Sequence, residues 1–489
     1  MRLEVEQAST SRAVPGLRSA GRMTSFPRLT FSQALVCLAG VSLAAVACLS
    51  PVHNDTWWHL AYGREMAAVG GFAQVDRFSH TGYGRPFPNH QWMGERIFYA
   101  LHVVGGLPLL TAFCATLLTG GWVLCWRLSR GALPDRLLVM AAAVAASTMV
   151  WSIRPQAFTL ALLPLTLTLL GGHRFGWVPP VILLWSNLHG GVLLGMIAVV
   201  VWTCCAFALR HSRRWALAAT FALSAGATFV TPLGVRYWPE IVASLRRSQV
   251  NRLQEWQAPA GPPEHIFFWV TAAALVGLGA LRWRRLTALS DRALAVTALV
   301  LLVPASRSLR NIAPFMMAAG PALSLLLTRS SRTAGPPTRS HPLAAGLVVA
   351  GVVGGAVLIT SAWSTAWRRL EWHPMTSQAA AAIRDCPEPI YNTYAGGGPI
   401  IWMVPGKRVF VDSRQDHYPP GVIALATELE NGADPVPVFR QFGLRCAVLP
   451  PASPVAGALS RTGWSVSYRD SQWTVLVAPE FEPSAGATP

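Results

Sequence analysis

The side chains best suited to acid–base chemistry gather in one stretch of the chain, residues 51–106. They are three carboxylates and three imidazoles: Asp55, Asp76, Glu95, His53, His59 and His90. A carboxylate can act as the general base that removes the proton of an acceptor hydroxyl. Arginine complements it, because its planar guanidinium can hold two oxygens of a phosphate at once. One carboxylate and a few arginines would therefore suffice to transfer a group from a phosphate-linked donor.

Asp55 is the first candidate for that base. It directly follows the first long apolar run, and Asn54 or Asp55 is predicted to cap a helix that continues to about Val69. On this helix Asp55, His59 and Tyr62 would share one face, because they are spaced at i, i+4 and i+7. The alternative is that Asp55 only caps the helix, although capping and catalysis are compatible.

The other acidic and imidazole side chains are predicted to position a substrate or to pack. A second helix near 91–104 would carry Glu95. A divalent cation stays open as a cofactor, although the loop contains no Asp-x-Asp motif and the chain contains no Cys/His metal spacing. The candidates for positioning are His53, His59, Asp76, His90, Glu95 and, far along the chain, His189.

Four arginines are candidates for binding a donor phosphate, because each lies where an apolar run ends on the same side as Asp55. They are Arg154, Arg236, Arg307 and Arg310. Arg307 and Arg310 are one helical turn apart and could clamp a single phosphate. For any one of them the alternative is a structural arginine, whose stem packs against apolar surface while its charge reaches the interface.

The elements that must position these residues are membrane helices. Of the 489 residues 52% are hydrophobic and only 13% are charged, a composition typical of a polytopic membrane protein. The net charge of +18 is distributed in short clusters between apolar runs. A nucleic-acid-binding protein would collect it on one stripe or patch, so nucleic acid is not an expected partner.

About eleven apolar stretches can form transmembrane helices, some of them short and held against protein. They cover residues 31–50, 107–126, 137–152, 155–171, 177–188, 190–209, 215–231, 265–281, 293–306, 312–328 and 342–361. The fifth stretch is short and contains Pro179 and Pro180. It could merge with the sixth into one helix that is broken around His189.

Arginine clusters occur in alternate loops, which predicts that residues 1–30 and every second loop are cytoplasmic. The basic loops lie at 127–136, 174, 210–214, 282–285 and 329–339. The loops at 51–106 and 232–264 and everything after about 362 would then lie outside. A competing interpretation makes residues 1–50 a signal peptide with a lipoprotein-like site at 45–48, but removing that span would invert the charge pattern.

Residues 362–480 are predicted to form a small extracytoplasmic α/β domain, followed by a disordered tail at 481–489. Helices are expected at 376–385 and near 421–432. Asp412 and Arg414 lie at the end of one expected strand and could form either a site or a local salt bridge. The sequence leaves open whether Cys386 and Cys446 form a disulfide. The expected strands are PIYN, RVFVDSR, CAVLPP, WSVSYRD and WTVLVAP.

These features together resemble one family. An Asp in the outer loop after the first span, two interfacial helices in that loop, about eleven spans and a C-terminal outer domain are similar to the GT-C fold of membrane glycosyltransferases. Several segments of the chain resemble a bacterial subgroup of this superfamily. They are DTWWHLAYGREM, DRFSHT, GRPFPNHQWMGE, WSNLHGG, TPLGVRYW, NTYAGGGPIIW and VFVDSRQDHY. The resemblance covers most of the chain and is more specific for the fold than for the substrate.

The resemblance implies a multi-pass protein of the bacterial inner membrane that uses a polyprenyl-phosphate-linked sugar. The predicted function is inverting transfer of that sugar to an extracytoplasmic lipid, polysaccharide or protein, with Asp55 as general base. One alternative is a catalytically silent scaffold for envelope assembly, because the fold alone does not fix the activity. The other is a lipid-linked sugar transporter or flippase, which would place ionisable groups within its spans; the spans contain essentially none.

Overall fold

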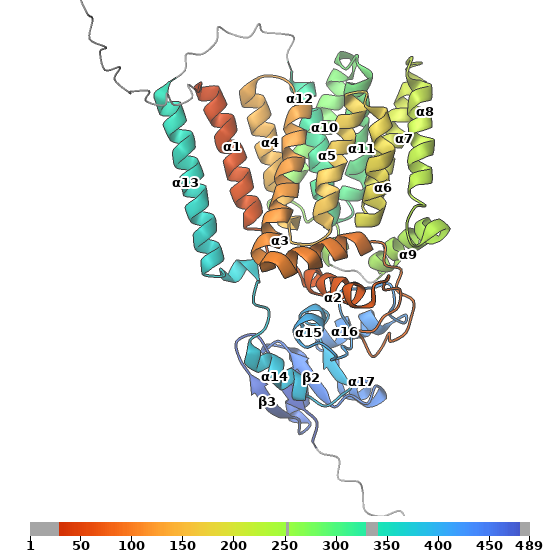
Figure 1. Cartoon of the computed structure of the whole chain (residues 1–489), viewed down its shortest axis with the longest axis vertical. Coiled ribbons are helices and arrows are strands. Elements are labelled where there is room, and N and C mark those ends of the chain that lie inside the picture. The colour runs from red at the N-terminus through yellow and green to blue at the C-terminus, as the bar shows by residue number, and fades with distance from the viewer. Residues whose placement is uncertain (1–28, 251–253, 329–340, 480–489) are drawn as a thin grey trace, which may run out of the picture.

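The computed structural model describes residues 29–250, 254–328 and 341–479. A bundle of helices forms one layer, and a smaller layer of short helices and strands lies below it (Figure 1). Helix α2 (Asn54–Val69) lies between the two layers. The predictions for residues 1–28 and for the tail at 481–489 lie outside the described residues.

Each predicted apolar stretch contains one helix of the bundle. In the described part of the chain these helices are α1 (Phe31–Cys48), α3 (Trp92–Leu128), α4 (Leu133–Ser147), α5 (Gln156–Gly171), α6 (Val178–Leu188), α7 (Val192–Ala208), α8 (Arg214–Ala227), α10 (Ile266–Arg282), α11 (Leu289–Ala305), α12 (Ile312–Leu327) and α13 (Pro342–Ser364). Among the described residues, five helices are long and apolar enough to cross a membrane: α1, α3, α10, α13, and α4 with the 3-10 turn η1 (Thr148–Val150) that extends it. The chain is therefore a multi-pass membrane protein.

Helix α12 lies at the centre of the bundle, where it packs against α4, α10 and α11. Small side chains along it, such as Ala318, Ala319 and Gly320, are buried and let the neighbouring helices approach closely. Helix α13 lies at the edge, where it packs against α1. Its other side chains are mostly exposed and apolar, as expected of a helix that faces lipid.

Helix α3 combines the predicted interfacial helix and the predicted second span. Its first part runs along the end of the bundle and its second part runs into the bundle (Figure 1). The backbone bends at Gly105 and Gly106, and Gly106 has a φ of 63°, a conformation that glycine adopts without steric cost. This bend places the start of α3 next to α2.

The N-cap of α2 is His53, not Asn54 or Asp55 as predicted. The His53 backbone is extended, and its Nδ1 lies 3.2 Å from the backbone nitrogen of Asp55. In return the His53 backbone N–H donates to Thr56 Oγ1 at 3.1 Å. Because an imidazole does the capping, the Asp55 carboxylate is free to bind elsewhere.

The smaller layer is built on one mixed sheet. Its strand order is β1-β2-β4-β3, in which β1 pairs with β2 in parallel and the other pairs are antiparallel. The strands are β1 (Ile390–Asn392), β2 (Cys446–Leu449), β3 (Ser465–Arg469) and β4 (Thr474–Val477). The helices are α14 (Ser377–Asp385), α15 (Gly397–Met403), α16 (Val422–Glu430), α17 (Val436–Gln441) and α18 (Pro454–Arg461), of which α15, α17 and α18 were not predicted. A disulfide joins Cys386 to Cys446, with 5.9 Å between their Cα atoms.

The predicted strand RVFVDSR was wrong. Only Val409 forms a bridge there, with Ser79 of the loop at 51–106. The backbone N–H of Phe410 donates instead to the side chain of Asn392 at 2.7 Å, and that of Arg414 donates to the Asp412 carboxylate at 2.8 Å. Side-chain acceptors thus replace the partner strand that the pattern predicted.

Helix α2 and the smaller layer share one apolar core. Trp58, Tyr62 and Met66 of α2 pack in a buried cluster with side chains of α14, α15 and the sheet. Gly398 of α15 lies directly against the backbone carbonyl of Asn54, where a Cβ atom would clash. The glycine-rich segment 396–398 thus allows the smaller layer to contact the first turn of the helix that carries Asp55.

Candidate functional site

Asp55 lies in a buried ion-pair cluster at the junction of the two layers. Its Oδ2 accepts a hydrogen bond from Arg154 Nη1 at 3.1 Å. The same Nη1 lies 2.8 Å from Glu255 Oε2. Arg154 precedes α5, and Glu255 lies in the 3-10 turn η4 (Gln254–Trp256) of the loop at 232–264. Segments about 100 and 200 residues from Asp55 along the chain, by the difference in residue numbers, therefore meet at this point.

The cluster continues to Arg310 and His189. Arg310, in the turn η6 (Leu309–Asn311), donates to Glu255 Oε1 at 2.9 Å. Its Nη2 lies 3.2 Å from His189 Nε2, and His189 Nδ1 lies 2.8 Å from Thr159 Oγ1. A guanidinium only donates, so His189 Nε2 must accept and the ring must be neutral. Glu255 thus bridges the two arginines.

The two carboxylates of the cluster are ionised at neutral pH. Burial alone would raise the pKa of Asp55, but His53 and Arg154 lower it well below the ordinary value. Burial would likewise raise the pKa of Glu255, but Arg154 and Arg310 lower it to about 2. With His189 neutral, the two negative charges are matched by two guanidinium groups.

His53 has two possible roles beside Asp55. Its Nδ1 lies 3.2 Å from the Asp55 backbone nitrogen and 3.3 Å from Asp55 Oδ2. Nδ1 can accept a hydrogen bond from the Asp55 backbone only when it carries no proton. It can donate a hydrogen bond to the Asp55 carboxylate only when it carries one. The tautomer and protonation of His53 therefore decide whether it caps the helix or binds the candidate base.

The smaller layer closes the site from the other side. Trp58 Nε1 lies 2.9 Å from Ser413 Oγ and 3.4 Å from Asp55 Oδ1. The Tyr394 hydroxyl donates to the carbonyl of Ser413 at 3.2 Å. Burial, with Asp55 and Glu255 nearby, raises the pKa of Tyr394 well above its ordinary value, so this phenol remains protonated.

Several buried polar atoms around the cluster have no partner among the described residues. Arg154 Nε and Trp256 Nε1 are unused donors, and Gln156 Oε1 is an unused acceptor. The Arg310 guanidinium lies over the Trp256 ring, 5.4 Å from its centroid. Unpaired donors are costly in a buried place. Arg154 Nε and Trp256 Nε1, with the Arg310 guanidinium beside them, suit an anion such as a phosphate.

The other acidic candidates lie in structural contacts. Glu95 is fully buried and lies 3.0 Å from His59 Nδ1 and 2.6 Å from Asn89 Nδ2. Asp76 accepts from Arg414 Nη1 at 2.6 Å and from Ser79. Glu95 thus holds α2 to α3, and Asp76 holds the loop at 51–106 to the smaller layer. Neither carboxylate pairs with a residue of the Asp55 cluster.

The remaining candidates differ in their distance from the cluster. His90 contacts Pro88 through Nδ1 and lies beside Gly190, next to His189. Arg236 is exposed and pairs with Glu240 at 2.9 Å. Arg307 is also exposed, and no acidic partner occurs for it among the described residues. The structure thus brings Arg154 and Arg310 together with Asp55, and leaves Arg236 and Arg307 outside.

Three residues of the site were not predicted from the sequence. Glu255 lies in an outer loop without a recognisable pattern. Ser413 and Tyr394 belong to the motifs VFVDSRQDHY and NTYAGGGPIIW, which carried the family resemblance but no assigned role. Their presence in those motifs was the one feature of the sequence that could have indicated a role in the site.

The site residues do not fit a metal ion. Within residues 29–250, 254–328 and 341–479 no group of three or more His, Cys, Asp or Glu side chains is placed to hold one. Asp55 and Glu255 are each bound by a guanidinium, and His189 accepts from Arg310. No step of the reaction proposed below relies on a metal.

The fold is similar to those of two solved proteins. The archaeal oligosaccharyltransferase AglB from Archaeoglobus fulgidus, in complex with an inhibitory peptide and a dolichol-phosphate, matches with a TM-score of 0.57 and 10% identity, over 85% of this chain and 69% of AglB. ArnT from Cupriavidus metallidurans, in the apo state, matches with a TM-score of 0.51 and 14% identity, over 90% of this chain and 97% of ArnT. Both are GT-C glycosyltransferases, so the predicted GT-C fold is confirmed. No protein-family model and no curated protein matches the sequence.

Proposed function

We propose that this GT-C-fold protein transfers a sugar from a polyprenyl-phosphate donor to a hydroxyl of an extracytoplasmic acceptor, with inversion at the anomeric carbon. The observation that carries the proposal is the buried cluster in which Asp55 pairs with Arg154, beside Arg310. The fold similarity to AglB, whose structure contains dolichol-phosphate, supports this class of donor.

In the proposed reaction the acceptor oxygen bonds to the anomeric carbon while the bond from that carbon to the phosphate oxygen breaks. The acceptor proton passes to Asp55, and the electron pair of the broken bond leaves with the polyprenyl phosphate. Arg154 and Arg310 neutralise the charge that develops on this leaving group. The buried setting strengthens these interactions, because little water screens them.

Glu255 links donor binding to the strength of the base. It accepts from both Arg154 and Arg310, which are the groups that the donor phosphate would use in this proposal. A phosphate that displaces Glu255 would also draw Arg154 away from Asp55. Since Arg154 helps to lower the pKa of Asp55, that pKa would rise toward its ordinary value. Asp55 would thus become a better base once the donor is bound.

Donor binding tests this assignment. Arg154→Lys and Arg310→Lys keep the charge but lose the planar fork, and each should weaken binding of a short-chain polyprenyl-phosphate sugar to the purified chain by about tenfold or more. Alanine at both positions should abolish binding. Arg236→Lys is the matched control, because Arg236 is an exposed arginine outside the cluster.

Equal affinities of Arg310→Lys and Arg236→Lys, at equal thermal stability, would remove Arg310 from the donor site. If the wild-type chain bound no donor at all, the scaffold alternative would gain support. Outer-surface substitutions in the smaller layer would then impair function more than changes at Asp55.

We further propose that all eleven helices of the bundle cross the bacterial inner membrane. In this arrangement residues 1–30 are cytoplasmic and 362–480 form the extracytoplasmic domain. Reporter fusions at positions 212 and 375 should then give opposite signals, because the arginine cluster at 210–214 stays inside. Equal signals would refute both the number of spans and the location of the site.

A further inference from the structure

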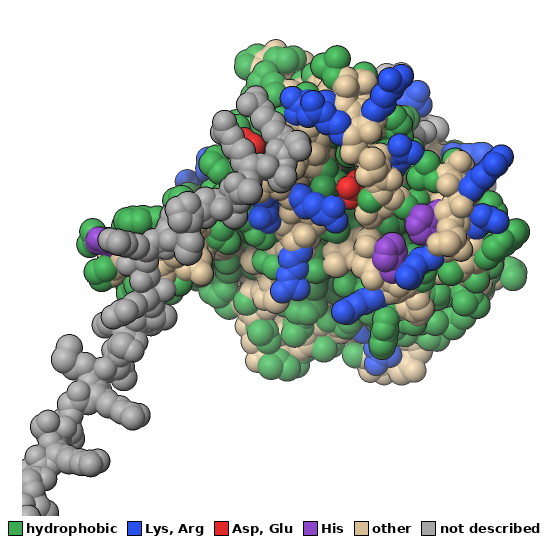
Figure 2. All heavy atoms as spheres, turned by 90° about the horizontal axis from the view of Figure 1, so that it is seen from above, with side chains coloured by type: hydrophobic (Ala, Val, Ile, Leu, Met, Phe, Trp, Pro, Cys, Tyr) green, Lys and Arg blue, Asp and Glu red, His purple; other side chains and the backbone are tan. Residues whose placement is uncertain are grey.

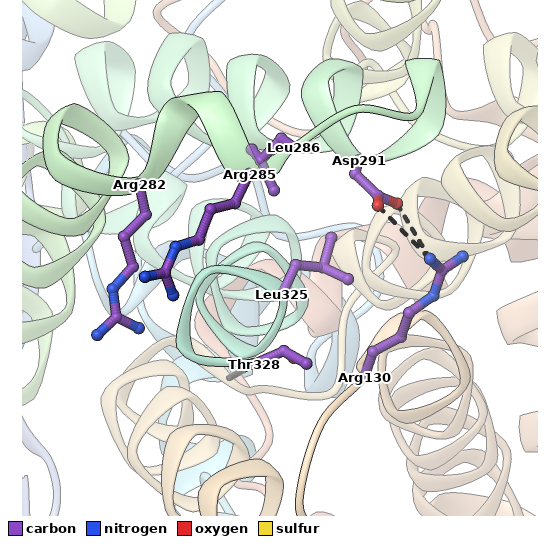
Figure 3. Close-up of a pocket in the computed structure, with 7 residues that line it drawn as sticks. All are labelled: Arg130, Arg282, Arg285, Leu286, Asp291, Leu325 and Thr328. Atoms are coloured by element: carbon purple, nitrogen blue, oxygen red, sulfur yellow. Dashed lines mark hydrogen bonds and ion pairs between the residues drawn. The ribbon is translucent and has the colours of Figure 1, made fainter. Parts of the chain in front are cut away.

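A cavity of about 840 Å³ opens at the end of the bundle opposite to the Asp55 cluster. Its lining comes from the ends of α10, α11 and α12, from the turn η5 (Trp283–Arg285) and from the loop between α3 and α4. The residues that line it are Arg130, Arg282, Arg285, Leu286, Asp291, Leu325 and Thr328 (Figure 3). Neither the candidate active site nor the proposed function uses any of them.

The charges of the cavity are unbalanced. Arg130 pairs with Asp291 at 3.3 Å, and this is the only carboxylate in the lining. Arg282 donates to the carbonyl of Leu326 at 2.8 Å, near the end of α12. Arg285 has no acidic partner among the described residues. Three guanidinium groups against one carboxylate leave a formal charge of +2, which an anion would offset.

The arrangement of the arginines distinguishes the cavity from the basic surface around it. Figure 2 shows Lys and Arg side chains over much of this end of the molecule, with few acidic ones. Such an excess is expected of the cytoplasmic side of any membrane protein. In the cavity, however, the side chains of Arg282 and Arg285 lie side by side next to the end of α12, and Arg130 lies on the other side of it (Figure 3). Two neighbouring guanidiniums can share the oxygens of one phosphate.

The position of the cavity favours a lipid over a soluble anion. It lies where the apolar helices α10, α11 and α12 end, which is the depth of the phospholipid headgroups. Leu286 and Leu325 contribute apolar surface beside the arginines. An amphiphile whose phosphate binds arginine while its glycerol and chains contact leucine matches both parts of this lining.

We infer that this cavity binds the phosphate of an anionic phospholipid, as a second anion site that is separate from the Asp55 cluster. The lipid would connect α10 and η5 to the end of α12, elements that have no covalent link at this end. Its effect should be on the stability of the bundle. The inference does not depend on the proposed sugar transfer; it rests on the proposal that α10, α11 and α12 cross the membrane.

The test uses the full-length chain purified in detergent. Thermal unfolding is followed while phosphatidylglycerol or phosphatidylcholine is added in mixed micelles, and an apparent affinity is taken from the rise in melting temperature. Phosphatidylglycerol should stabilise the wild type and phosphatidylcholine should not, because choline neutralises its phosphate. Arg285→Gln should lower the apparent affinity for phosphatidylglycerol about tenfold or more, since a charged hydrogen-bond donor is lost.

Arg284→Gln is the matched control, because Arg284 is an exposed neighbour in the same turn and does not line the cavity. It should respond to phosphatidylglycerol as the wild type does. Equal affinities of Arg284→Gln and Arg285→Gln, or equal stabilisation by the two lipids, would overturn the inference. Stabilisation by inorganic phosphate that prevents any further effect of lipid would overturn the lipid assignment and leave a site for a soluble phosphate.

Discussion

Replacing Asp55 with asparagine should lower the rate of sugar transfer by about 10²-fold or more, while the protein still folds. The amide keeps the shape of the side chain but cannot take up the proton of the acceptor hydroxyl. The fold should persist because Arg154 keeps Glu255 as a partner and because His53, rather than Asp55, caps α2. Turnover of a polyprenyl-phosphate sugar, measured at equal thermal stability, gives the result.

Asp55→Glu is the informative companion variant, since it restores a carboxylate and should recover part of the rate. Retained activity in Asp55→Asn would assign the base to another residue. Asp76 and Glu95 lie in buried structural contacts, so Glu255 would be the first replacement to examine. Because the pKa of Asp55 is already far below its ordinary value, no acidic limb near neutral pH is expected from Asp55 in kcat/KM, which reports the free enzyme.

Replacing Arg414 with methionine should destabilise the protein by about 3–5 kcal/mol. Arg414 is buried between Asp76 and Asp412 and also donates to the Tyr62 hydroxyl at 2.8 Å. Without its charge, two carboxylates remain buried without a counter-ion. The measurement is thermal unfolding in detergent. Arg408→Met is the control, because Arg408 is exposed and lies over the Tyr83 ring.

The same cluster predicts the pH dependence of stability. Burial would raise the pKa of Asp76, but Arg414 and His417 lower it to about 2. The stabilisation from Asp76 is therefore complete above its unfolded pKa of about 4 and is lost as the pH falls toward 2. In Arg414→Met the pKa of Asp76 should rise, so mild acid should destabilise that variant less than it destabilises the wild type. If the variant kept wild-type stability at neutral pH, the cluster would not hold α2 and the loop that carries Asp76 to the smaller layer.

The sequence predicted the helices of the bundle well, because a long apolar stretch can satisfy its own backbone hydrogen bonds only as a helix. It was less informative where side chains replace backbone partners. His53 caps α2 although imidazole is not a usual cap, and Asn392 accepts the hydrogen bond that the expected strand at Phe410 would have given to a neighbour. Alternation of residue types does not reveal such contacts.

For the site, the sequence indicated which residues lie near the outer ends of helices but not which of them meet. Arg154 pairs with Asp55, and Arg310 joins the same cluster through Glu255, whereas Arg236 pairs with Glu240 away from it. The direction of each side chain depends on how the helices pack around α12, which a single sequence does not show. Glu255 was missed for the same reason, since its role depends on a loop that returns to the bundle.

The shared core of α2 and the smaller layer limits where the chain can be divided to make chimeras with related proteins. Trp58, Tyr62 and Met66 lie about 310 or more residues before α14 in the chain, by the difference in residue numbers, yet they complete the interior of that layer. The backbone of Asn54 touches Gly398 of the same layer. A chimera that takes its C-terminal region from another protein must therefore take α2 from it as well. Residues 54–87, which include the Asp76 partner of Arg414, and residues 371–479 form one modular unit that is interrupted in sequence by the bundle.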